Sequence, residues 1–102
     1  MGEFTTVGRA EEVAEGQVKP YEVAGQQIAV TRIDGTLHAF SDICTHKACS
    51  LSPGETLGTA IECECHGSVF DMTSGAVVEG PATEPVATFG VRDEGGALQI
   101  EA

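Results

Sequence analysis

Cysteine and histidine residues gather in two short segments of the chain. The first contains Cys44 and His46 in a C-x-H arrangement, and the second contains Cys63 and His66 in a C-x-x-H arrangement, with sixteen residues between the two. Each segment offers one thiolate and one imidazole, and both groups bind transition metals. Two such segments can hold a metal centre from opposite sides.

A structural zinc site is the main alternative use of two Cys and two His. Such sites usually pair Cys with Cys and His with His, each pair at its own short spacing. The mixed segments here do not follow that arrangement, so their spacing favours another kind of metal centre. His38 lies apart from both segments in a strand-like stretch. Without partner ligands it is interpreted as an ordinary strand histidine.

The composition indicates one small, acidic domain. The 102 residues leave no room for a second core, so we expect residues 1–102 to form a single domain. Sixteen Asp and Glu against five Lys and Arg give a net charge of −11, which disfavours binding to nucleic acid or anionic membranes. The charge suits a protein partner with a basic patch, or it serves solubility alone.

The sequence shows no membrane-spanning or export signal. Its apolar stretches fall far short of the roughly 20 residues that span a bilayer, and residues 1–13 lack the basic and apolar regions of a signal peptide. We therefore expect a cytoplasmic protein. Cysteines in such a chain are more often metal ligands or redox groups than a disulfide framework.

Short strands separated by turn sequences must position the two segments. Asp34-Gly35 is a strong hairpin signal, and Gly-rich turns recur along the chain. Residues 9–15 could form one helical turn. We expect strands at residues 18–23, 27–33, 36–40, 59–62, 69–72, 76–78, 86–92 and 97–101. This pattern predicts an antiparallel all-β domain.

The two segments resemble those of the Rieske family, from Asp42 to about Ala82. The resemblance implies a Rieske fold of antiparallel sheets with a small cluster-binding subdomain at about 42–82, and one [2Fe-2S] cluster. Besides the Cys and His residues, the matching stretches are Gly67-Ser68, Phe70-Asp71, Thr73-Ser74-Gly75 and Gly80-Pro81-Ala82.

In this family two Cys bind one iron, two His bind the other, and two sulfides bridge them. The resemblance therefore implies that Cys44 and Cys63 bind the inner iron, and His46 and His66 the outer iron. Two ferric irons, two sulfides and two thiolates sum to zero charge, so histidine ligation eases reduction and raises the potential. The histidine edges face solvent in the family, where a partner should dock.

Residues around the ligands would tune the cluster. By resemblance, the Ser68 hydroxyl bonds a bridging sulfide and stabilises the reduced state, and Pro81 belongs to a proline loop over the cluster. Phe70 stands where high-potential respiratory members have Tyr, which predicts a lower potential. Lys47 replaces an apolar residue of those members, and it could equally be an ordinary exposed loop lysine.

Cys49 and Cys65 are the second cysteines of their segments. Respiratory Rieske proteins join cysteines at these positions in a disulfide that ties the cluster loops together, and the resemblance implies the same bond here. The reducing cytosol favours two thiols instead. This pair departs from the usual ferredoxins of dioxygenase systems.

Chain length selects among the Rieske proteins. The chain shows neither the anchor of a respiratory subunit nor the catalytic domain of an oxygenase, so it most resembles the ferredoxins of aromatic-ring-hydroxylating dioxygenases, such as the biphenyl and carbazole systems. This implies a monomeric one-electron carrier, not an enzyme, between a flavin-dependent ferredoxin reductase and a terminal Rieske oxygenase. The alternatives are a Rieske-like small subunit of an assimilatory nitrite reductase, or a structural zinc-binding module.

Overall fold

The computed structural model describes residues 3–45 and 48–102. The strands and the one 3₁₀ turn are β1 (Phe4–Arg9), η1 (Ala10–Glu12), β2 (Val18–Val23), β3 (Gln26–Ile33), β4 (Thr36–Ser41), β5 (Glu55–Leu57), β6 (Ala60–Glu62), β7 (Val69–Asp71), β8 (Val77–Glu79), β9 (Thr88–Glu94) and β10 (Ala97–Glu101). The predicted antiparallel all-β fold is confirmed. Within the described ranges, no helix is long and apolar enough to cross a membrane.

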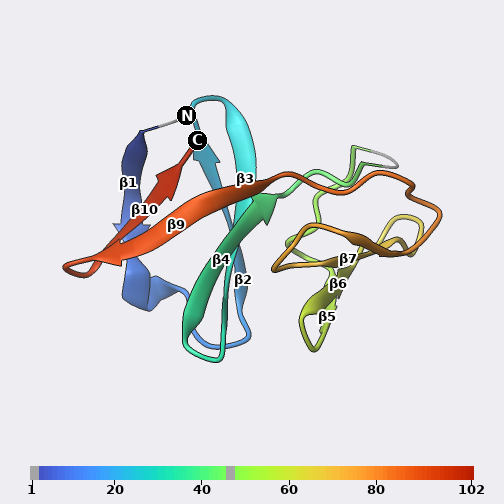
Figure 1. Ribbon diagram of the computed structural model, residues 1–102, viewed down its shortest axis with the longest axis horizontal. Helices are drawn as coiled ribbons and strands as arrows, with labels where there is room; N and C mark the ends of the chain where they lie inside the picture. The colour runs from blue at the N-terminus through green and yellow to red at the C-terminus, as the bar shows by residue number, and fades with distance from the viewer. Residues whose placement is uncertain (1–2, 46–47) are drawn as a thin grey trace.

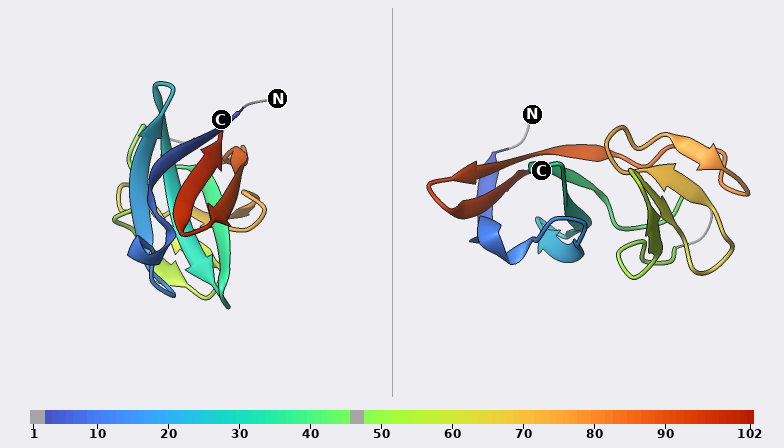
Figure 2. Two further views of the ribbon diagram at one scale, coloured as in Figure 1. Left: turned by 90° about the vertical axis from the view of Figure 1, so that its left-hand side faces the viewer. Right: turned by 90° about the horizontal axis from the view of Figure 1, so that it is seen from below.

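The strands form two sheets, which define two lobes of the molecule (Figure 1). The large lobe, residues 3–41 and 88–102, contains six strands in the order β1-β10-β9-β4-β3-β2. The small lobe, residues 42–87, contains four strands in the order β5-β6-β7-β8. The large sheet curls until its edge strands β1 and β2 approach each other (Figure 2).

The small lobe is inserted between two paired strands of the large lobe. Phe40 of β4 lies opposite Thr88 of β9, and the Ser41 N–H donates to the carbonyl of Ala87 at 2.8 Å. The chain therefore leaves and re-enters the large sheet at the same place. The two segments that contain the Cys and His residues both belong to the inserted part of the sequence.

The β3–β4 hairpin forms at the predicted turn. Asp34 and Gly35 have φ values of 51° and 80°, the positive values that a type I′ turn requires. The Glu15 carboxylate accepts hydrogen bonds from both backbone N–H groups, at 2.6 and 2.9 Å. This contact ties the hairpin to the segment after η1.

Strands β3 and β4 are buried on both faces. Ile28 and Val30 point into the interior of the curled large sheet, whereas Ala29 and its cross-strand partner Phe40 pack against the small lobe. All four are 0% exposed. Burial on both sides explains why the alternation of these strands is only partial in the sequence, since neither face needs polar residues.

The structure corrects the sequence prediction at several elements. The helical turn predicted at residues 9–15 shrinks to η1, because Arg9 belongs to β1 and Val13 turns inward with 1% exposure. Strands β1 and β5 were not predicted. The strand predicted at 86–92 is shifted to β9, because residues 86 and 87 still belong to the connection from the small lobe.

Candidate metal centre

The first loop, residues 43–50, carries Cys44 and is closed at its base by backbone pairing. Ile43 and Ser50 form an antiparallel bridge, and the Cys44 N–H donates to the carbonyl of Cys49 at 2.8 Å. Cys44 is 4% exposed, so the loop turns its sulfur inward. His46 and Lys47, two positions singled out from the sequence, lie outside the described residues.

The second loop, residues 63–68, connects β6 to β7. The Cys63 N–H donates to the Ser68 carbonyl at 2.7 Å, and the Gly67 N–H donates back to the Cys63 carbonyl at 3.0 Å. Gly67 has a φ of +79°, a conformation that side chains disfavour. The tight loop keeps Cys63 buried at 1% exposure while His66 stays exposed.

The two loops bring the Cys44 and Cys63 thiols within hydrogen-bonding reach of each other. Burial raises the pKa of the Cys63 thiol, and the adjacent Cys44 thiol raises it further, whereas the backbone N–H groups of Cys65 and His66 act in the opposite direction. Two buried thiols in contact thus share a site where backbone donors already point at sulfur.

A disulfide joins the two loops. Cys49 at the end of the first loop and Cys65 in the second are bonded with an S–S distance of 2.04 Å and a Cα–Cα distance of 6.6 Å. Cys44 and Cys63 take no part in this bond. The four cysteines therefore divide into a buried pair of thiols and a bonded pair nearer the surface.

A third loop, residues 80–86, runs alongside the other two and is named the proline loop. Ser68, which is 0% exposed, accepts a hydrogen bond from the Ala82 N–H at 3.0 Å. The Thr45 hydroxyl donates to the Glu84 carbonyl at 2.6 Å. Pro81 is exposed. The first and second loops are therefore both hydrogen-bonded to the proline loop.

Sequence reasoning assigned no role to Thr45 or to the Asp42 side chain. Thr45 lies between two predicted ligands, but its partner is 39 residues away, so no local pattern reveals the contact. Asp42 is 2% exposed, and its carboxylate accepts hydrogen bonds from the backbone N–H and the hydroxyl of Ser52, at 2.6 and 3.2 Å. The one feature of the sequence that could have drawn attention to Asp42 is its position directly before the first loop.

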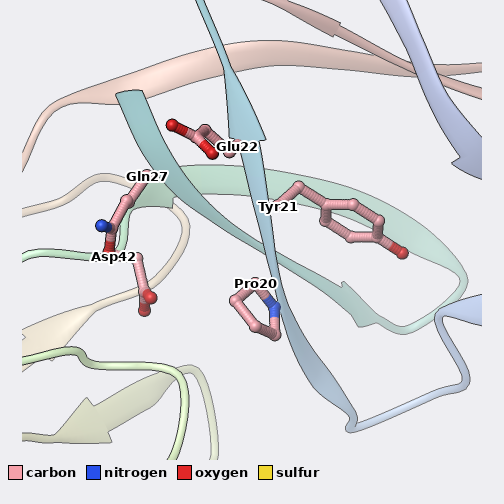
Figure 3. Close-up of a pocket in the computed structure, with 5 residues that line it drawn as sticks. All are labelled: Pro20, Tyr21, Glu22, Gln27 and Asp42. Atoms are coloured by element: carbon pink, nitrogen blue, oxygen red, sulfur yellow. The ribbon is translucent and has the colours of Figure 1, made fainter. Parts of the chain in front are cut away.

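A shallow pocket of about 240 Å³ lies where the two lobes meet. Figure 3 shows the Gln27 and Asp42 side chains near one another, while the Tyr21 ring points away from them. None of the described candidate metal ligands lines this pocket, and the Asp42 carboxylate in it already accepts hydrogen bonds from Ser52. Its lining residues are Pro20, Tyr21, Glu22, Gln27 and Asp42.

Carboxylates surround the second loop. Glu55 and Glu62 lie opposite each other on β5 and β6, and they line a recess of about 380 Å³ together with Cys63, Glu64 and Gly67. Like charges directly opposite on neighbouring strands are unfavourable. The acidity predicted from composition is thus concentrated in part beside the candidate metal ligands.

The described residues fit a metal centre held between the first and second loops. The two touching thiols and the N–H groups directed at Cys63 suit sulfur ligands, whose negative charge needs hydrogen bonds away from water. Within residues 3–45 and 48–102, no three His, Cys, Asp or Glu side chains gather to hold a single ion. A two-iron cluster needs two protein ligands for each iron.

An all-β chain with paired thiols on adjacent loops fits a metal-binding protein with thiolate ligands, and comparison with known families specifies the class. Residues 3–90 match the Rieske [2Fe-2S] domain family. The chain belongs to this family, and the predicted [2Fe-2S] cofactor is confirmed. The zinc alternative is thereby set aside.

Two curated relatives are ferredoxins of dioxygenase systems. The chain is 33% identical over 90 residues to the ferredoxin component of a naphthalene 1,2-dioxygenase system from Pseudomonas aeruginosa, covering 88% of this chain and 86% of the relative. It is 34% identical over 99 residues to the biphenyl dioxygenase ferredoxin subunit of Pseudomonas sp. (strain KKS102), covering 96% and 91%.

Solved structures of ferredoxins share the fold. The ferredoxin of carbazole 1,9a-dioxygenase from Nocardioides aromaticivorans IC177 superposes with a TM-score of 0.90 at 25% identity, covering 96% of each chain. A chain in a complex of reduced oxygenase and oxidized ferredoxin of carbazole 1,9a-dioxygenase matches with a TM-score of 0.89 at 30% identity, covering 96% of this chain and 92% of that one.

Proposed function

We propose that this chain is a one-electron carrier that takes electrons from a flavin-dependent ferredoxin reductase and gives them to the terminal oxygenase of an aromatic-ring-hydroxylating dioxygenase system. The observation that best supports this proposal is that relatives of similar length are ferredoxin components of such systems. A structural neighbour comes from a ferredoxin–oxygenase complex. These likenesses favour an oxygenase partner over the nitrite reductase alternative.

The cluster supplies reversible one-electron chemistry. For its ligands we propose Cys44 and Cys63 on the inner iron and His46 and His66 on the outer iron. Burial of both Cys residues supports this division, since their sulfurs face the core while His66 is exposed. The exposed side of the second loop is then the place where electrons enter and leave.

Two further residues would shape the cluster environment. Because Ser68 uses its oxygen to accept the Ala82 N–H, its hydroxyl hydrogen remains available for a bond toward a bridging sulfide. Pro81 belongs to the exposed loop that this bond holds in place. Ser68 therefore both positions the proline loop and tunes the reduction potential.

The charge and size of the chain support a diffusing carrier. We propose that it acts as a monomer in the cytoplasm, away from nucleic acid and membranes, and that its net charge of −11 attracts partners with basic surfaces. A carrier that serves two partners in turn benefits from fast, weak association, which electrostatic steering provides.

The test uses the purified holoprotein. We expect a reddish-brown protein that dithionite bleaches, with a low average g value by electron paramagnetic resonance. In stopped-flow mixing, the reduced protein should then reduce the Rieske cluster of a terminal oxygenase. His66→Ala should lose or alter the spectrum, whereas His38→Ala, a matched change on β4, should keep both spectrum and transfer.

Two outcomes would contradict the proposal. A colourless protein that binds stoichiometric zinc would remove the redox role. A protein with a normal Rieske spectrum that assembles into a nitrite reductase as its small subunit, and that reduces no dioxygenase, would keep the cluster and reject the proposed partner.

A further inference from the structure

The turn between β3 and β4 contains the one Asp-Gly pair of the sequence, which has no Asn. Asp34 and Gly35 are both exposed, and within the described parts of the chain no hydrogen bond or ion pair holds the Asp34 carboxylate. A backbone nitrogen attacks the side-chain carboxyl of a preceding Asp most easily when it belongs to Gly, which has no side chain to hinder the approach. The product of this reaction is isoaspartate, in which the main chain runs through the side chain.

The Glu15 carboxylate occupies the two backbone N–H groups of this turn. Its Oε1 accepts a hydrogen bond from the Gly35 N–H at 2.9 Å, and its Oε2 accepts one from the Asp34 N–H at 2.6 Å. Hydrogen bonds to a carboxylate are stronger than those between neutral groups. The nitrogen that would attack the Asp34 carboxyl is therefore the donor to one oxygen of Glu15.

Glu15 is held beside the turn by the backbone on both sides of it. Glu15 and Arg32 form a parallel bridge, and the Gly16 N–H donates to the Arg32 carbonyl at 2.9 Å. The Arg32 side chain in turn donates through Nε to the Val13 carbonyl at 2.8 Å. The position of the carboxylate is thus set by the fold, although the Glu15 side chain is exposed.

The hydrogen bond to Glu15 opposes the reaction for two reasons. First, the Gly35 nitrogen bonds to Cγ of the protonated Asp34 carboxyl, and the amide hydrogen leaves with the carboxyl hydroxyl as one water molecule. The nitrogen of the resulting succinimide carries no hydrogen, so it cannot keep the bond to Glu15. Second, removing the amide proton develops negative charge next to an anionic oxygen, which is unfavourable. Ring closure therefore requires Glu15 to move away.

We propose that Asp34-Gly35 is a site of isoaspartate formation, and that Glu15 sets the rate by holding the Gly35 N–H. Water opens the succinimide at the bond between the nitrogen and the main-chain carbonyl carbon of Asp34. One water leaves and one enters, so the mass is unchanged. The product carries a free α-carboxylate, the group that a methyltransferase specific for isoaspartate esterifies with S-adenosylmethionine.

The modification changes the hairpin but lies far from the metal centre. It adds one main-chain carbon to a two-residue turn, and such turns fix the register of the strands that they join. Figure 1 shows the turn and the start of the small lobe at opposite ends of β4. The six residues Thr36–Ser41 separate them by about 20 Å. Isoaspartate at this turn should therefore leave the cluster spectrum unchanged.

The test compares three holoproteins, which are wild type, Glu15→Gln and the matched control Glu22→Gln, an exposed position on β2. Each is incubated for several weeks at neutral pH. Isoaspartate is quantified by labelling with the methyltransferase and located by peptide mapping. Glu15→Gln should accumulate isoaspartate at position 34 several-fold faster than the other two, because a neutral amide with one acceptor oxygen replaces a carboxylate with two. All three should keep the same visible spectrum.

Two further measurements separate this effect from general loosening of the sheet. Hydrogen exchange followed by mass spectrometry should be faster at the turn in Glu15→Gln than in Glu22→Gln, and equal in the remainder of β3 and β4. Wild type incubated in urea, where the Glu15 contact is absent, should form isoaspartate at least as fast as native Glu15→Gln. Asp34→Ser removes the reacting carboxyl and should abolish labelling of the turn.

Three results would overturn the proposal. One is equal formation of isoaspartate at Asp34 in Glu15→Gln and Glu22→Gln. Another is labelling that arises at other Asp residues while Asp34 stays intact. The third is faster exchange throughout β3 and β4 in Glu15→Gln, which would assign any acceleration to opening of the sheet rather than to the Gly35 N–H.

Discussion

The two lobes are both antiparallel sheets, yet they are stabilised in different ways. Strands of the large lobe have five to eight residues, and they enclose a core of their own. Strands of the small lobe have three residues each, and its core includes Ala29 and Phe40 from the large lobe together with Cys44 and Cys63.

This difference separates stability from function. The large lobe has enough regular pairing and apolar burial to hold its shape, whereas we expect the small lobe to depend on its neighbour, on the disulfide and on a bound metal centre. A protein built this way can specialise its small lobe for redox chemistry while the large sheet carries the fold. The predictions below test that division.

Removing a proposed ligand should have the largest effect and should be confined to the small lobe. Cys63→Ser is expected to abolish the normal cluster, since a buried thiolate ligand is replaced by a hydroxyl. Iron content and visible absorbance measure the loss, and far-ultraviolet circular dichroism should still show the large sheet. Complete loss of β structure would mean that the large lobe is not independent.

Core truncations in the two lobes should also differ in their consequences. Phe70→Ala and Leu98→Ala each empty a fully buried position, one in each core. We expect losses of about 3–5 and 2–5 kcal/mol in the free energy of unfolding. Denaturant titration measures both losses.

Cluster retention distinguishes the two truncations. Phe70 shares its core with Cys44 and Cys63. Phe70→Ala should therefore speed cluster loss more than Leu98→Ala does, even where both variants lose the same free energy of unfolding. Equal rates of cluster loss in the two variants would show that the cores act as one.

Asp71 should give a smaller, pH-dependent effect in the small lobe. Its carboxylate accepts hydrogen bonds from the backbone of Thr73 and Ser74 and from the Thr59 hydroxyl. The pKa of Asp71 is lowered to about 2, and the largest cause is hydrogen bonding by Thr73. Because the folded pKa lies below the usual 3.8, the stabilisation is present above about pH 4 and is lost as pH falls toward 2.

Asp71→Asn is therefore expected to cost about 1 kcal/mol at neutral pH, a value reduced by solvent screening at this partly exposed site. The difference in the free energy of unfolding between wild type and variant should shrink near pH 3. A difference that stays constant from neutral to acidic pH would assign the effect to shape rather than charge.

The smallest effect should come from surface charge. Glu62→Gln/Glu64→Gln removes two carboxylates beside the second loop, and Glu11→Gln/Glu94→Gln removes two from the large lobe. If partners dock at the small lobe, only the first pair should slow association with the reductase, and added salt should reduce the difference. Stopped-flow kinetics measure it, and equal slowing by both pairs would assign the effect to overall charge.

Local signals in the sequence were sufficient to predict several elements. Strands β2 and β10 and the Asp34-Gly35 turn follow from alternation and turn chemistry, which act over a few residues. The two Cys and His segments are similarly local, and their spacing led to the family. The same segments place Cys44 and Cys63 on adjacent loops, as the structure shows.

Long-range contacts could not be predicted in this way. Strand β1 exists through its pairing with β10, nearly the whole chain away, and β5 is an exposed stretch without an apolar pattern. The Thr45 bond to Glu84 likewise joins distant segments. The β1–β10 pairing and the Thr45–Glu84 bond form within a lobe only after distant parts of the chain have come together, and a single sequence holds no local record of them.

The insertion of the small lobe between β4 and β9 makes it a portable unit. Its two ends are held side by side by the Ser41–Ala87 hydrogen bond and the Phe40–Thr88 pair, as adjacent strands of any antiparallel sheet would hold them. A host must supply two neighbouring antiparallel strands like β4 and β9, and also small apolar and aromatic side chains on one face, as Ala29 of β3 and Phe40 of β4 provide here. Residues 42–87 are therefore a template for grafting a redox centre onto an unrelated β scaffold.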